Sequence, residues 1–336
     1  MPAITTAIYN NLRSFLFSQI YRAPFIFHPS TRNFIGVQQL TRLLPHYHEI
    51  CHHRMFDFAG NLYTVPLNGV IEQGKFEAIL ISDEQLFYDT NKIYIICVGG
   101  NTTCYQVLIP EMLDIYYKQS AQVRLIGFNP PGVGLSPGST EDQNKYCAAL
   151  KSIIDNLLEN KIAAKNIMVV GHSLGACIAA RIVAEYHKQG LGIYLFVDRT
   201  MTSVGAAAGA KIRRLLPLAF RYLLGAFFYY VTEMLVKLLN LDLNVVADVE
   251  TIHNNKPGAV KGMMAHEDEL MEGCCLSLGL PKTILPYFKK FKLRAEERIR
   301  KSHSKVRIDL IHDAGHETAD EYLHSCIREM TARLRA

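Results

Sequence analysis

Residues 167–175 read Ile-Met-Val-Val-Gly-His-Ser-Leu-Gly, and this stretch decides the fold. Its first four residues are apolar and mostly β-branched, which is typical of a buried strand. The small, alanine-rich residues after Ser173 predict a helix over Leu174–Lys188. A Gly-x-Ser-x-Gly pattern between strand and helix places the serine on a tight turn, where small flanking residues let the two elements approach closely. The stretch therefore predicts a strand, a turn that presents the Ser173 hydroxyl, and a helix.

The same pattern occurs a second time around Ser136, so the pattern alone does not select a serine. The residue after Ser136 is Pro137, which has no N–H to donate to an oxyanion. Ser136 also lies in a loop rich in proline and glycine, Asn129–Gly138, and not directly after a strand. Leu174, in contrast, follows Ser173 with a free N–H at the start of a helix. The chemistry of the turn therefore favours Ser173 as the nucleophile.

Outward from this stretch, strand and helix signals alternate. Repeated βα units joined by short loops predict an α/β fold with a mostly parallel central sheet and helices on both faces. Two short strands around Gly60-Asn61 predict a β-hairpin before these units. The expected strands are Arg54–Ala59, Leu62–Leu67, Phe76–Ser82, Lys92–Val98, Val123–Phe128, Asn166–Val170, Gly192–Val197, Val260–Ala265 and Val306–His312. The expected helices are Ile109–Gln119, Glu141–Asn160, Leu174–Lys188 and Glu317–Leu334, with a helical region after the strand Val260–Ala265.

The chain divides into four parts. Residues 1–53 are expected to form an N-terminal extension packed on the core, and residues 54–199 the first part of the core. Residues 200–250 are expected to form a helical cap or lid, inserted before the penultimate strand, and residues 251–336 complete the core. A chain of 336 residues is long enough for one large core with such an insertion.

The insertion is unusually apolar. Its longest uncharged run, Tyr222–Thr232, is too short to span a bilayer. One interpretation is a cap packed on the core, and the other is a lid that lines an acyl pocket or touches lipid. The second interpretation predicts a peripheral membrane contact through residues 211–240.

Composition excludes several classes of protein. With 49% hydrophobic and 20% charged residues, the chain is globular and not disordered. No basic patch interleaved with aromatic residues is visible, so nucleic acid is not an expected partner. His46, His48, His52 and His53 lie close together without the fixed spacing of metal ligands, and we expect neither a metal nor a cofactor.

The eight cysteines form no Cys-x-x-Cys pair, and we interpret them as reduced thiols. The first residues, Met-Pro-Ala-Ile-Thr-Thr, do not resemble a secretory signal. We therefore expect a cytoplasmic protein, or one exported without a cleaved N-terminal signal, including into a host cell.

A serine nucleophile needs a histidine to take its proton and a carboxylate to orient that histidine. In the fold class that this strand–turn–helix resembles, the acid and then the base follow the serine in the chain. His316 lies in the loop between the last expected strand and the last expected helix, whereas His312 is still on the strand. His316 is therefore the predicted base.

The acid is expected just after the penultimate strand, Val260–Ala265. Asp268 is the predicted acid, and a shift of register would select its neighbours Glu267 or Glu269 instead. Asp198, at the end of the preceding strand, is the alternative acid, because a carboxylate there could reach the same histidine. Asp198 could also form a structural ion pair with the arginine that follows it.

The oxyanion of a tetrahedral intermediate needs two backbone donors. The N–H of Leu174 is expected to be one of them. The other is expected from the loop Gly99–Thr102, where glycine lets the backbone approach a substrate closely, and either Gly100 or Asn101 supplies it. All these residues follow the carboxyl ends of parallel strands, where α/β sheets bind ligands.

At these residues the sequence resembles the α/β-hydrolase superfamily, over roughly residues 55–336 without the insertion. The resemblance implies an oxyanion loop, a glycine-rich loop, a nucleophile turn and segments that carry the acid and base. One departure is Val98, which stands where many members carry a histidine before the glycine. The segments that carry the resemblance are 98–101, 128–136, 171–175, 266–268 and 315–316.

Residues 101–106 and 197–203 are also similar to segments of hydrolase-like proteins from chlamydiae and other intracellular bacteria, which implies an enzyme used inside or against a host cell. The predicted function is hydrolysis of carboxylic esters, with lipid or acyl-chain substrates, through an acyl-enzyme on Ser173. The alternatives are a peptidase of the same fold and an inactive relative that binds a partner or a membrane.

Overall fold

The structure is a computed structural model, and it describes the ranges 50–65, 71–82, 88–100, 103–119, 122–138, 143–215, 224–238, 243–265, 288–291 and 319–335. Most of the expected N-terminal extension and the expected strand Val306–His312 lie outside the described residues.

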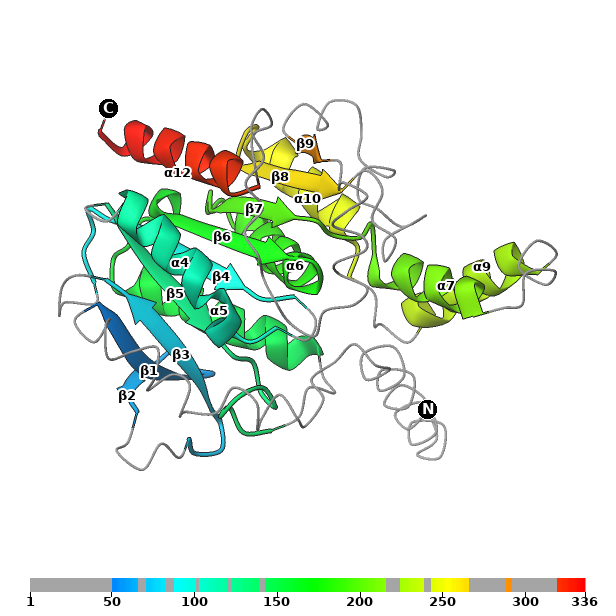
Figure 1. Cartoon of the computed structure of the whole chain (residues 1–336), viewed down its shortest axis with the longest axis horizontal. Coiled ribbons are helices and arrows are strands. Elements are labelled where there is room, and N and C mark those ends of the chain that lie inside the picture. The colour runs from blue at the N-terminus through cyan, green and yellow to red at the C-terminus, as the bar shows by residue number, and fades with distance from the viewer. Residues whose placement is uncertain are drawn as a thin grey trace.

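The described residues form a nine-stranded sheet with the order β2-β1-β3-β5-β4-β6-β7-β8-β9 (Figure 1). The pairs β1–β2, β1–β3 and β3–β5 are antiparallel, and all other neighbouring strands are parallel. The mostly parallel sheet and the N-terminal hairpin match the sequence prediction. The strands are β1 (Cys51–Asp57), β2 (Leu62–Thr64), β3 (Lys75–Ile81), β4 (Ile93–Val98), β5 (Val123–Phe128), β6 (Ile167–His172), β7 (Tyr194–Asp198), β8 (Val260–Ala265) and β9 (Phe288–Phe291).

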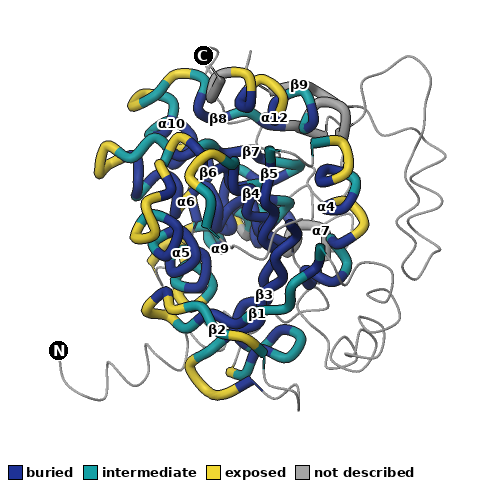
Figure 2. The backbone as a smooth tube through the Cα atoms, turned by 90° about the vertical axis from the view of Figure 1, so that its left-hand side faces the viewer, coloured by how far each residue is buried: buried dark blue, intermediate teal, exposed yellow. Residues whose placement is uncertain are grey.

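Helices cover both faces of this sheet, and its central strands are buried on both sides (Figure 2). Alternation along β4 shows why: Ile93, Ile95 and Cys97 pack in one cluster with α4 and α12, while the residues between them pack in the other cluster with α5, α6 and α10. Fully burying one such aliphatic side chain stabilises the fold by about 1.5–3 kcal/mol. These helices are α4 (Tyr105–Gln119), α5 (Gln143–Glu159), α6 (Leu174–Lys188), α10 (Val245–Asn255) and α12 (Ala319–Arg335).

Several boundaries shift slightly from the sequence prediction, and two elements, β1 and α4, begin well ahead of their predicted starts. The sheet begins at Cys51 and not at residue 54, because β1 pairs with β3 from the register Cys51↔Ile81 onward. Helix α4 begins at Tyr105, ahead of the expected Ile109. Its first N–H donates to the side chain of Asn129 at 2.8 Å, a partner that lies in another loop. Both differences arise from contacts with distant segments, which local sequence patterns do not report.

Strand β9 was not expected, because the segment after β8 was predicted to be helical. Its four residues, Phe-Lys-Lys-Phe, show no clear alternation that would indicate a strand. They pair in parallel with β8, from Gly262↔Phe288 to Ala265↔Phe291. Pairing with an existing sheet edge therefore decides the conformation of this short segment.

A helical insertion lies between β7 and β8. Helices α7 (Val204–Leu215) and α9 (Gly225–Leu238) pack against each other and extend away from the sheet, whereas α10 packs on α6 (Figure 1). A β-carbon on Gly209 of α7 would lie 2.8 Å from the backbone oxygen of Tyr229, so glycine is what lets these two helices approach closely. Among the described helices, none has the length and apolar content needed to cross a membrane.

Candidate active site

Ser173 lies where β6 ends and α6 begins. Its backbone has φ +52° and ψ −118°, so it is one of three non-glycine residues with positive φ in the described part of the chain. Such a conformation costs on the order of 1–3 kcal/mol and persists only where the surrounding structure holds it. The side chain is half-buried. The turn thus presents a serine hydroxyl at the N-terminal end of a helix.

The small residues on either side of Ser173 are required by their backbone neighbours. A β-carbon on Gly171 would lie 2.5 Å from the Cα of Ala176. A β-carbon on Gly175 would overlap the carbonyl oxygens of Val98 and Gly99 and lie 2.8 Å from the Gly99 carbonyl carbon. The spacing of the pattern therefore follows from how closely β6, α6 and the loop after β4 pack.

Two hydrogen bonds hold the backbone of Ser173 in place. Its N–H donates to the carbonyl oxygen of Asp198 at 2.9 Å, and its own carbonyl accepts from the Thr200 hydroxyl at 2.7 Å. Both partners lie at the end of β7 or just after it. The strained turn is thus fixed by the neighbouring strand, which explains how the positive φ is tolerated.

The loop after β4 passes directly beside Ser173. A β-carbon on Gly100 would lie 3.2 Å from the Cβ of Ser173 and 3.0 Å from the backbone oxygen of His172. This residue is one of the two predicted oxyanion donors, and the other, Asn101, lies outside the described residues. Leu174 is the first residue of α6, and N–H groups in the first helical turn have no acceptor within the helix. The backbone of this loop and the start of α6 therefore meet at the serine.

Tyr146 of α5 fixes the orientation of this loop. Its hydroxyl donates to the carbonyl oxygen of Gly99 at 2.8 Å, while Thr103 N–H donates to the carbonyl of Gly100 at 3.2 Å. Burial raises the pKa of Tyr146, so the hydroxyl keeps the proton that it donates. Because the peptide unit is planar and trans, fixing the Gly99 carbonyl also fixes the direction of the Gly100 N–H. Sequence reasoning did not identify Tyr146.

Asp198, the alternative acid, is held by two basic groups. His172 Nδ1 lies 2.7 Å from its carboxylate, and Arg199 donates from Nε and Nη2 at 2.8 Å each. Burial alone would raise the pKa of Asp198, but Arg199 and His172 outweigh burial and hold the pKa well below its ordinary range. Both carboxylate oxygens of Asp198 take part in these contacts with Arg199 and His172. Asp198 thereby holds the side chain of His172, the residue before Ser173, in place.

Asp268, its neighbours Glu267 and Glu269, and His316 lie outside the described residues, so the structure does not place them. The described strands show where the chain leaves the sheet. Strands β6, β7 and β8 are parallel, with Asp198 aligned with His172 and with Met263. Strand β8 therefore ends at the same edge of the sheet as Ser173.

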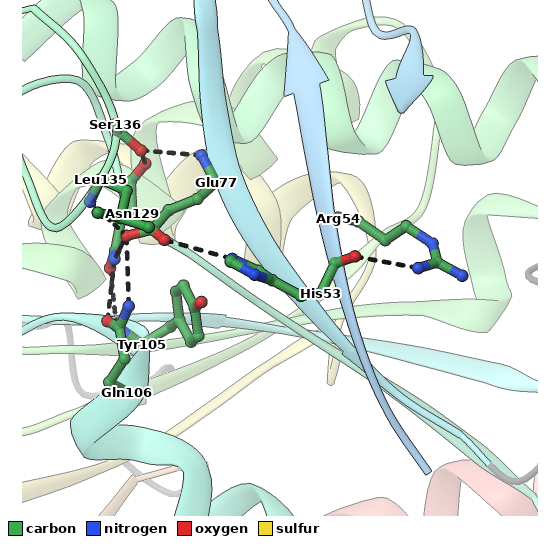
Figure 3. Close-up of polar contacts among 8 residues, drawn as sticks. All are labelled: His53, Arg54, Glu77, Tyr105, Gln106, Asn129, Leu135 and Ser136. Atoms are coloured by element: carbon green, nitrogen blue, oxygen red, sulfur yellow. Dashed lines mark hydrogen bonds and ion pairs between the residues drawn. The ribbon is translucent and has the colours of Figure 1, made fainter. Parts of the chain in front are cut away.

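Ser136, the serine of the second pattern, is fully buried in a polar network (Figure 3). Its hydroxyl donates to the carbonyl of Asn129 at 2.8 Å and accepts from the N–H of Glu77 at 2.9 Å. The buried carboxylate of Glu77 accepts from the N–H of Leu135 at 2.8 Å and from the side-chain amide of Asn129. Ser136 therefore holds a loop in place, with its hydroxyl fully used.

No group of three histidine, cysteine, aspartate or glutamate side chains in the described ranges is arranged to hold a metal ion. His52 and His53, half of the histidine cluster, are consecutive residues of β1 and so point to opposite faces of the sheet.

A family model and one solved structure agree with this architecture. A family model described as alpha/beta hydrolase fold matches residues 95–199. An alpha-beta hydrolase from Vibrio vulnificus is similar in structure, with a TM-score of 0.53 at 16% identity over 87% of this chain and 91% of that chain. An esterase from Pyrococcus furiosus has a TM-score of 0.48 at 18% identity, over 80% of this chain and 89% of its own. A search of curated protein sequences finds no match.

Proposed function

This chain has the α/β-hydrolase fold that its sequence predicts, and from that premise we propose that it is a serine hydrolase that cleaves carboxylic esters through an acyl-enzyme on Ser173. The observation that carries the proposal is the turn at Ser173. A strained serine at the start of α6 lies against the backbone of Gly100, and this combination suits attack on a carbonyl and stabilisation of its oxyanion.

In the proposed reaction, the Ser173 oxygen attacks the ester carbonyl while His316 takes the hydroxyl proton. The N–H of Leu174 and that of Gly100 or Asn101 donate to the oxyanion of the tetrahedral intermediate. Collapse of the intermediate releases the alcohol, which receives the proton from His316. Water then attacks the acyl-enzyme by the same steps, and the carboxylic acid leaves.

Asp268 is proposed as the residue that orients His316, and Asp198 remains the alternative. The contacts of Asp198 favour this choice, because both of its oxygens already accept from Arg199 and His172. A carboxylate that served the catalytic histidine would have to exchange one of these partners.

The test is active-site labelling with a fluorophosphonate probe. Wild type should be labelled, whereas Ser173→Ala should not be labelled and should lose at least ~10³-fold of its activity on p-nitrophenyl esters. The matched control is Ser136→Ala, the serine of the other Gly-x-Ser-x-Gly copy, which should still be labelled when folded. If the wild-type protein is not labelled, the proposal that it is a serine hydrolase is contradicted. The chain would then be an inactive relative that binds a partner.

The same assay examines the substrate class. Activity that rises with acyl-chain length supports a lipid or acyl-chain substrate. Activity confined to the shortest esters contradicts that substrate, and cleavage of peptide amides in preference to esters would favour a peptidase.

Tyr146→Phe tests the proposed oxyanion loop. The variant keeps the buried ring but removes the hydroxyl that holds the Gly99 carbonyl, so the Gly100 N–H loses its fixed direction. We expect kcat to fall roughly 10-fold with KM nearly unchanged, which is less than the 10²–10³-fold loss on deleting an oxyanion donor outright. Affinity for a boronic acid, which mimics the tetrahedral intermediate, should fall by the same factor as kcat/KM.

The control for this variant is Tyr88→Phe. This variant also removes a phenolic hydrogen bond, which Tyr88 donates to the side chain of Asn156 in α5 at 2.8 Å. Asn156 lies far along α5 from the loop after β4. Equal kcat values for the two variants would show that Tyr146 only stabilises the fold.

A further inference from the structure

Helix α9 uses one face to pack on the rest of the protein. Thr232 and Val236 are buried, and the backbone of Tyr229 lies against Gly209 of α7. These contacts hold the helix in a fixed rotation about its axis. The opposite face of α9 is therefore directed outward in a defined way.

That outward face carries a stripe of large apolar side chains. Phe227, Tyr230, Met234 and Leu238 are 62%, 67%, 53% and 65% exposed. Their spacing of three or four residues places them on one side of a helix with 3.6 residues per turn. Six of the eight large exposed hydrophobic side chains in the described part of the chain fall between Leu224 and Leu238. Soluble surfaces rarely concentrate apolar area in this way unless it binds something.

The net charge of the segment around the stripe indicates what kind of surface the stripe would bind. Residues 204–238 contain five basic residues and one acidic residue, a net charge of +4. The acidic residue, Glu233, is already paired with Lys237 at 2.7 Å. The segment that exposes the apolar stripe therefore carries a clear net positive charge. The basic residues are Lys211, Arg213, Arg214, Arg221 and Lys237.

We propose that the α7–α9 helix pair docks on an anionic lipid surface, with the stripe formed by Phe227, Tyr230, Met234 and Leu238 inserted at the boundary between headgroups and acyl chains. Apolar and aromatic side chains on one face, combined with basic residues, are what interfacial helices use. The insertion leaves the sheet directly after β7, at the edge where Ser173 lies. Docking would therefore bring the proposed hydrolase site to lipid, which rests on the proposed function, although binding itself does not need Ser173.

The test is co-sedimentation of the full chain carrying Ser173→Ala with vesicles, so that no turnover is involved. Vesicles of equal parts phosphatidylcholine and phosphatidylglycerol should bind the protein, vesicles of phosphatidylcholine alone should bind it much less, and added salt should weaken binding. Combined replacement Tyr230→Ser, Met234→Ser and Leu238→Ser should lower the apparent affinity at least ~10-fold. Because these side chains are exposed, the melting temperature should stay close to that of the parent.

Two controls separate the contributions. Tyr117→Ser removes a similarly exposed aromatic residue from α4 and should leave binding unchanged. Arg213→Gln with Arg214→Gln should weaken binding to the anionic vesicles while leaving the residual binding to neutral ones. Absence of binding to anionic vesicles would overturn the proposal. So would a wild-type dimer in analytical ultracentrifugation that the triple variant converts to a monomer, because the stripe would then bind a second copy of the chain.

Discussion

Gly175→Ala is expected to reduce hydrolysis severely, although only one methyl group is added. Its β-carbon would overlap the carbonyl oxygens of Val98 and Gly99, which are backbone atoms and cannot rotate away. The chain can accept the methyl group only if α6 and the loop after β4 move apart. Overpacking of this kind costs about 1–3 kcal/mol. A displacement of about 1 Å between Ser173 and the donors of the loop should lower kcat/KM at least ~100-fold.

Chemical denaturation and ester hydrolysis, measured on the same preparation, check this prediction. Gly74→Ala is the control, because a β-carbon there meets nothing within 4 Å although φ is +82°. It should cost about 1–2 kcal/mol through backbone strain alone and leave kcat/KM unchanged. If Gly175→Ala retained wild-type activity, the loop after β4 would not be part of the catalytic site.

The turn at Ser173 could be predicted because the residues that specify it are close together in the sequence. An apolar β-branched strand, two glycines and a small-residue helix lie within about twenty consecutive residues, and the structure places β6 and α6 there. The parallel sheet could be predicted for a similar reason, since each βα unit is contiguous in sequence. The start of α4 could not, because the acceptor for its first N–H is Asn129, 24 residues away.

The choice between the two serines shows the same limit. Pro137 was sufficient to argue that Ser136 lacks an oxyanion donor. The role of Ser136 was not predictable, because its partner Glu77 is 59 residues away on β3. One signal was present in the sequence: Glu77 is the one acidic residue inside the run Lys75–Ile81, which otherwise reads as a buried strand. A charged residue in such a run is rarely buried without a specific partner.

Glu77→Ala is expected to lower the free energy of unfolding by about 3–5 kcal/mol. The Glu77 side chain is fully buried and accepts hydrogen bonds from the N–H of Leu135, the side-chain amide of Asn129 and, at 3.3 Å, that of Gln106 (Figure 3). Removing the carboxylate leaves these donors buried without their acceptor, and each such donor costs about 1–3 kcal/mol. Urea unfolding followed by circular dichroism measures the change. Glu72→Ala, which removes an exposed carboxylate just before the same strand, should have little effect.

A double-mutant cycle can show that the loss comes from the loop and not from β3 itself. Gly134 has φ +56°, and a β-carbon there would overlap the carboxylate oxygen of Glu77 and the amide nitrogen of Asn129. Gly134→Ala should therefore be strongly destabilising in the wild-type background. In the Glu77→Ala background the carboxylate is absent and the Asn129 amide is released, so mainly the backbone strain of about 1–2 kcal/mol should remain. Substitutions at neighbouring residues that share one network are expected to have non-additive effects on the free energy of unfolding. Additive effects of the two substitutions would mean that Glu77 does not hold the loop around Ser136, and that its burial stabilises the sheet by some other contact.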